Sequence, residues 1–178
     1  MGILFYINRI KDHFDIKTRT TIVEALVLSQ INYCSLVWGS SNKTQIHCVQ
    51  LLQNFAAKVA EGNSRKYDHA TPIIRKLNWM KIHEKVFYDL SLLMYKIMTH
   101  RYPEWFCHFP AVRTERRLGT RQADNLIIPN TRTNTGSKLL AVRGPKCWNS
   151  LPNSIRNSCS ITSFKTKMKG YVKNMGTN

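Results

Sequence analysis

The sequence predicts a mainly α fold, in which a helical bundle is followed by a small mixed tail. Apolar residues recur every three or four positions along much of the chain, as they do in amphipathic helices. Hydrophobic residues make up 43% of the sequence and charged residues 21%, and four Trp and seven Phe supply large core side chains. This is the composition of a folded globular protein. We expect a helical domain over residues 1–110 and a basic tail over residues 111–178.

Most helices of the first domain are predicted from the spacing of their apolar residues. The expected apolar stripes are Ile3, Ile7, Ile10 and Phe14; Ile22, Val23, Leu26, Val27 and Ser29 within residues 17–33; Ile46, Val49, Leu52, Phe55, Ala56, Val59 and Ala60; and Val86, Phe87, Leu90, Leu93, Met94 and Ile97 within residues 83–100. Thr44 is expected to cap the third helix, and Gly62 to end it. A short helical segment is expected to open at Thr71 and Pro72.

The tail has a different pattern. Residues 125–129 and 138–143 are predicted as two short β-like runs that can pair as a hairpin across the polar residues 130–137. Gly144 and Pro145 are expected to turn the chain, and Leu151 and Pro152 to open a short helical turn. Ser160 can cap a final helix, whose expected apolar edge is Phe164, Met168, Tyr171 and Val172.

The charge of the chain is strongly positive and uneven. Twenty-seven Lys and Arg against ten Asp and Glu give +17, and the sequence pI is about 10.0. Residues 1–100 carry 13 basic and 7 acidic residues, whereas residues 101–178 carry 14 and 3. This asymmetry favours polyanion binding by the tail over an ordinary basic surface. The candidate contacts for RNA or DNA phosphates are Arg113, Arg116, Arg117, Arg121, Arg132, Lys138, Arg143, Lys146, Lys165, Lys167, Lys169 and Lys173.

No pattern typical of an active site is present, so we do not expect an enzyme. The ten carboxylates form no close pair suited to two-metal phosphoryl transfer, and there is no glycine-rich phosphate loop. The five cysteines are odd in number and lack CxxC spacing, which predicts free, mostly buried thiols and a reducing compartment. We expect no metal, no cofactor, no small-molecule substrate and no membrane partner, and an intracellular location, nuclear or cytoplasmic.

Seven stretches, taken in order, carry a family resemblance. They are residues 25–39 (ALVLSQINYCSLVWG), 51–58 (LLQNFAAK), 72–82 (PIIRKLNWMKI), 92–96 (LLMYK), 129–133 (PNTRT), 144–156 (GPKCWNSLPNSIR) and 158–165 (SCSITSFK). Together they resemble the C-terminal region of non-LTR retrotransposon reverse transcriptases, RNA-directed DNA polymerases of the jockey- and RTE-like type. The sequence departs from the family pattern at Ser29 and Lys81, where the family usually has Pro, and at Gly144, where it has Ala.

The resemblance covers only the region C-terminal to the catalytic palm in that family, namely the helical thumb and the tail beyond it. It implies a truncated, non-catalytic piece that binds a template–primer backbone at most, because the palm holds the paired aspartates. Two alternatives stay open: a free-standing or domesticated nucleic-acid-binding module, and a helical protein-interaction domain. A face exposed by truncation would favour self-association. Trp38, Trp79 and Trp148 can stack on bases, although core packing is the stronger expectation.

Overall fold

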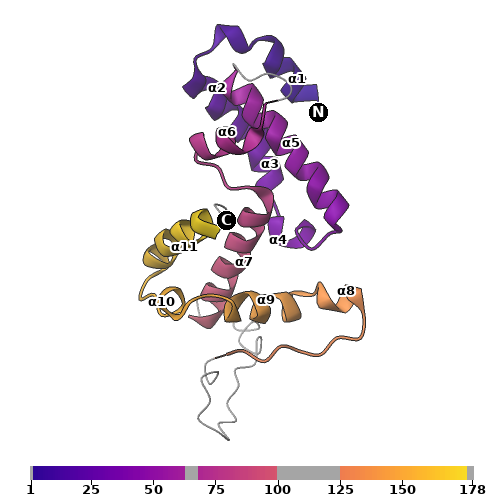
Figure 1. Ribbon diagram of the computed structural model, residues 1–178, viewed down its shortest axis with the longest axis vertical. Helices are drawn as coiled ribbons and strands as arrows, with labels where there is room; N and C mark the ends of the chain where they lie inside the picture. Colours follow the sequence, from indigo (N-terminus) through magenta and orange to yellow (C-terminus); the bar gives the residue numbers. More distant parts are fainter. Residues whose placement is uncertain (1, 63–67, 100–124, 176–178) are drawn as a thin grey trace, which may run out of the picture. The chain divides into compact units, whose positions relative to one another are not determined.

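The computed structural model describes residues 2–62, 68–99 and 125–175, and these are mainly α-helical, as predicted (Figure 1). The chain divides into two compact units, Met1–Val86 and Phe87–Asn178. The boundary that the sequence predicts, between residues 110 and 111, lies outside the described residues and stays a prediction. Among the described helices, none is both long and apolar enough to cross a bilayer.

The first unit begins with short helices that pack on one long helix. Its elements are α1 (Gly2–Arg9), η1 (Lys11–His13), α2 (Ile16–Val23), the π-helical turn η2 (Glu24–Leu28), α3 (Ser29–Asn32), α4 (Ser35–Trp38), α5 (Lys43–Glu61) and α6 (Ala70–Lys76). The long helix α5 contacts α1, α2 and α6. The core of this unit gathers on the facing sides of these helices.

The predicted first helix is shorter than its apolar stripe suggests. It ends at Arg9, and it buries Leu4 and Ile7 while Ile3 remains 47% exposed. The predicted second helix is present as α2, η2 and α3, which succeed one another without a break. Asp15 starts it, because its carboxylate accepts a hydrogen bond from the backbone N–H of Thr18 at 3.2 Å.

Arg19 closes the C-terminal end of α5. This arginine is only 7% exposed, and its guanidinium donates to the carbonyl oxygens of Lys11, Ala60 and Glu61 at 2.8, 3.2 and 2.9 Å. Gly62 ends the helix as predicted, with a left-handed φ of 84°. A Cβ at this glycine would stand 2.5 Å from Cζ of Arg19, so glycine leaves room for the guanidinium. The helix starts at Lys43 after Asn42, and Thr44, the predicted cap, lies inside it.

Two glutamines of α5 hold the segment that leads into α7 (Ile82–Met98). Gln53 donates to the carbonyl of Met80 at 2.7 Å, and Gln50 accepts from the N–H of Ile82 at 2.9 Å. Glu84 is buried in the first turn of α7, where it accepts from the N–H of Lys81 at 2.9 Å and pairs with the Arg75 guanidinium. The bonds from the N–H groups of Lys81 and Ile82 satisfy donors that the start of a helix leaves without intrahelical partners.

The second unit has its core around Phe164. Its elements after α7 are α8 (Asn134–Ser137), α9 (Leu140–Asn149), α10 (Asn153–Arg156) and α11 (Ile161–Met175). The Phe164 ring is fully buried and stacks on Tyr95, with centroids 4.3 Å apart, and on Trp148 at 6.4 Å. Ser160 caps α11 as predicted, since its hydroxyl accepts from the N–H of Ser163 at 3.1 Å.

The predicted hairpin is not formed, because its second run is helical. Lys138 lies in a turn after α8, and residues 140–143 open α9. Val142, Pro145 and Trp148 are all buried at three-residue spacing, which a helix satisfies and a strand does not. The expected turn at residues 144–145 is likewise wrong, because Pro145 lies inside α9.

Replacing Arg19 by Met should destabilise the first unit by about 3 kcal/mol, because three carbonyl oxygens lose a charged donor in a buried place. Urea unfolding followed by circular dichroism measures this loss, and hydrogen exchange should show faster exchange at the end of α5. The control is Lys17→Met, an exposed position in the same helix, expected to change stability by less than about 0.5 kcal/mol. Equal effects of the two substitutions would contradict the role given to Arg19.

Candidate nucleic-acid interface

The end of the chain combines many cations with a complete lack of carboxylate side chains. From residue 125 onward the sequence contains nine Lys and Arg and no Asp or Glu: Arg132, Lys138, Arg143, Lys146, Arg156, Lys165, Lys167, Lys169 and Lys173. Within this stretch no acidic side chain offsets the positive charge. The charged side chains of this stretch are therefore all positive.

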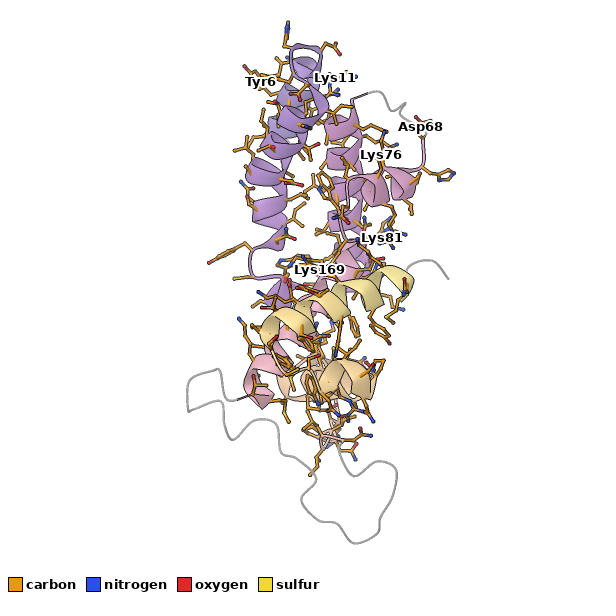
Figure 2. The ribbon with its side chains drawn as sticks, turned by 90° about the vertical axis from the view of Figure 1, so that its left-hand side faces the viewer. Tyr6, Lys11, Asp68, Lys76, Lys81 and Lys169 are labelled. Carbon is orange, nitrogen blue, oxygen red and sulfur yellow. The ribbon has the colours of Figure 1, made fainter. Side chains whose placement is uncertain are left out.

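Seven of these nine side chains are exposed. Arg132 precedes α8, Lys138 comes directly after it, and Lys146 lies on the outer side of α9. The other four exposed side chains lie on α11, from which Lys169 projects in Figure 2: they are Lys165, Lys167, Lys169 and Lys173. Backbone phosphates are recognised by such exposed ammonium and guanidinium groups.

Two of the nine cations are partly withdrawn from solvent. Arg143, a predicted contact, is half-buried in α9, and this burial lowers the pKa of its guanidinium from the ordinary value. Arg156 is not among the predicted contacts. Its guanidinium donates to the side-chain oxygens of Asn125, at 3.1 Å, and Asn153. Arg156 is therefore a structural residue that fastens α10 to the start of the described tail.

The remaining predicted contacts form the cluster Arg113, Arg116, Arg117 and Arg121. These four arginines lie outside the described residues, and their role stays a prediction.

The tryptophans named as possible stacking platforms pack inside the protein. Trp79 is 8% exposed and Trp148 is 6% exposed. The Trp79 indole N–H donates to the Glu24 carboxylate at 2.7 Å, and the Trp38 indole N–H donates to the carbonyl of Tyr33 at 2.9 Å. Core packing, the stronger expectation, is thus what the structure shows for Trp79 and Trp148, and Trp38 packs partly buried against the core of the first unit.

Two open pockets occur in the first unit, away from the acid-free stretch in sequence. One, of about 560 Å³, lies between α1, η1, α5 and α6 and is lined by Lys11, Lys58, Asp68 and His69 among others. The second, of about 550 Å³, is mostly apolar and includes Ile3, Leu26, Trp38 and Leu52. In the described part of the chain, no group of three or more His, Cys, Asp or Glu side chains is placed to hold a metal ion.

The cysteines differ from expectation. Cys34, Cys48 and Cys159 are exposed, so the prediction of mostly buried thiols is wrong for the described residues, where Cys147 alone is buried. Cys34 and Cys48 each have one apolar or aromatic neighbour in sequence, which did not reveal their exposure, whereas Cys159 stands between two serines. Cys147 lies 3.3 Å from the Ser91 hydroxyl, and burial raises the pKa of its thiol to about 11.

Three comparisons with known proteins were without a match. No protein-family model matches the chain, and searches of curated proteins and of solved structures found no match.

Cys147 should resist alkylation in the folded protein. With a pKa of about 11, only about one thiol in a thousand is ionised at pH 8, and thiolate is the reactive form. Iodoacetamide at pH 8 should label Cys34, Cys48 and Cys159 first, and Cys147 only as the pH approaches 11 or after unfolding. Peptide mass spectrometry monitors each site. Labelling of Cys147 as fast as that of Cys159 at pH 8 would show that the second unit does not bury this side chain.

Proposed function

We propose that this chain binds the phosphate backbone of RNA or DNA without catalysing a reaction. The observation that carries this proposal is the acid-free stretch from residue 125, with seven exposed cations on helices and their flanks. Each cation that meets a phosphate releases condensed counterions, and this release drives binding. Anionic side chains would oppose it, and this stretch has none.

Binding of this kind tracks the backbone and does not read base sequence. Base-specific contacts need side chains that reach base edges, and stacking needs exposed aromatic rings. In the second unit the aromatic rings of Tyr95, Trp148 and Phe164 are buried in the core. Six of the seven exposed cations of the acid-free stretch are lysines, whose ammonium groups meet phosphates as point charges.

The family resemblance supports the same function from a different direction. We propose that the chain corresponds to the region C-terminal to the palm in non-LTR retrotransposon reverse transcriptases. A polymerase thumb grips the duplex through its backbone, which requires a helical, basic surface and no active site. Such a role implies a location inside the cell, with nucleic acid in the nucleus or cytoplasm.

Affinity for a 20-base-pair duplex DNA should fall steeply with salt. Six phosphate contacts correspond to a slope of about −5 in a plot of log K against log salt concentration. Fluorescence anisotropy at several salt concentrations gives this slope. Replacing Arg132, Lys138 and Lys146 by Gln should reduce affinity more than replacing Arg9, Lys17 and Lys43, three exposed cations of the first unit.

Equal losses in these two variants would mean that only net charge matters, and binding that ignores salt would contradict the proposal. Primer-extension assays on a primed RNA template should show no nucleotide incorporation. Incorporation by the purified chain would overturn the non-catalytic part.

A second function, self-association, is favoured by the apolar pocket of the first unit. Ile3 and Leu26 line this pocket and are 47% and 45% exposed. Exposed apolar surface of this kind is common where a partner binds. The occupant that we propose is a second copy of the chain.

Replacing Ile3 by Glu should therefore weaken dimers, because it places a charge in an apolar contact. Sedimentation equilibrium should show dimers for the wild type and at least tenfold weaker association for the variant. The control is Tyr33→Glu, a 76% exposed position that does not line the pocket. A monomeric wild type at all concentrations would exclude this second function.

A further inference from the structure

Helix α11 carries three rows of residues with distinct surroundings. The first row, Phe164, Met168 and Val172, is buried in the second unit. The second row, Lys165, Lys169 and Lys173, is exposed and lies about 100° around the helix, because each member stands one position after a buried residue. The third row, Thr162, Thr166 and Gly170, precedes the buried residues by two positions and so lies nearly opposite to them, on the outer face.

Lys167 does not belong to the lysine row. It precedes Met168 by one position, which places it on the other flank of α11. Its ammonium group donates to the carbonyl oxygen of Ser154 in α10 at 2.9 Å. The three lysines of the row therefore share one flank, and the fourth is turned toward α10.

Gly170 is the unexpected residue of the outer face. A glycine inside a helix destabilises it by roughly 0.5–1 kcal/mol relative to alanine. Neither packing nor a left-handed backbone requires glycine here, since an added Cβ would have no atom of the described chain within 4 Å. The neighbouring Thr166 hydroxyl bonds back to the carbonyl oxygen of Thr162 at 3.1 Å, so this side chain also stays close to the helix. The side chains of the outer face are therefore short and polar, and the row of lysines lies beside them.

We propose that α11 lies lengthwise against one strand of a nucleic acid, with the row Lys165, Lys169 and Lys173 on phosphates of that strand and Gly170 at the closest approach. This inference rests on the proposed function and names the surface that performs it. From Lys165 to Lys173 the row is about 12 Å long, at 1.5 Å per residue. One strand of duplex DNA presents a phosphate about every 3.4 Å of axis, so this length covers about three to four phosphates. Each of the three long, flexible lysine side chains can therefore reach a phosphate.

The burial pattern favours nucleic acid over a membrane surface. A basic amphipathic helix binds a bilayer by inserting its apolar face between the headgroups. In α11 that face is Phe164, Met168 and Val172, and it is occupied by the core of the second unit. The outer face and the lysine row are polar and cationic, which suits a phosphate backbone. The exposed Met175 lies in the last position of α11 and belongs to neither row.

The first test compares charge variants that are matched in number. Changing Lys165, Lys169 and Lys173 together to Gln should make the salt slope for duplex DNA about 2.7 less steep, at about 0.9 per lost contact. The matched control changes Arg9, Lys17 and Lys43 to Gln and removes the same charge from the first unit. Lys167→Gln, on the other flank, should change the slope by much less than the roughly 0.9 of one lost contact. If the α11 triple variant changes the slope no more than the matched control, the inference is wrong.

The second test keeps the charge and changes the shape. Gly170→Leu should raise thermal stability slightly, since leucine favours the helix, and should weaken duplex binding at least tenfold by holding the backbone away. Gly170→Ala should keep most of the affinity, and Asn157→Leu, an exposed position after α10, should bind like the wild type. Circular dichroism confirms that each variant is folded.

The outcomes separate this inference from the proposed function. If the wild type shows no salt-dependent binding, the proposed function itself fails. If the wild type binds and Gly170→Leu binds equally well, the proposed function stands and the α11 surface is wrong. Vesicles with 30% phosphatidylserine serve as a second probe, and a loss of vesicle binding in Gly170→Leu without any loss of duplex binding would also overturn the inference.

Discussion

The first unit depends on the guanidinium of Arg19 at the end of α5. A helix leaves its last carbonyl oxygens without intrahelical donors and concentrates negative potential there. Arg19, which lies in α2, donates hydrogen bonds to two of these carbonyl oxygens and places a positive charge beside them. The Lys11 ammonium donates a further bond to the carbonyl of Gly62 at 2.9 Å. Through these two cations the end of α5 is fixed to η1 and α2. A side chain at position 62 would collide with this guanidinium, so this packing requires glycine there.

The second unit achieves its stability without acidic side chains from its own last fifty residues, which contain no Asp or Glu. The contacts that fix this part of the chain are apolar or run from side chain to backbone. Tyr95 stacks on Phe164 and donates its hydroxyl to the carbonyl of Ser158 at 2.8 Å, and the Asn149 amide makes two bonds to the backbone of Leu126 at 2.9 Å. Such contacts hold a fold together while leaving its net positive charge in place. The like charges, which repel one another in the free protein, can therefore attract a polyanion.

Much of the fold could be predicted from the sequence, and the failures have physical causes. The helices α5, α7 and α11 have long apolar rows in the sequence, and residues of these rows are buried in the structure. The first helix is different, because Leu4 is buried in place of Ile3, a choice that only contact with α5 decides. The sequence predicts a hairpin from two short β-like runs on either side of residues 130–137, and a turn at residues 144–145 because proline normally ends a helix. Burial of Val142 and Trp148 on α9 outweighs this preference, and no local pattern reveals it.

The proposed binding surface could be predicted in composition but not in arrangement. The sequence places four lysines on the last helix, and only the buried row tells which of them share a flank. The bond from Lys167 to Ser154 then separates one lysine from the other three. The significance of Gly170 needs the structure as well, because a glycine in a sequence does not show whether its surroundings are crowded or open. On α11 the residues that fold the protein and those that face outward lie on different sides of one helix. Substitutions on the outer side leave the buried row untouched, so folding and the proposed binding can be measured independently there.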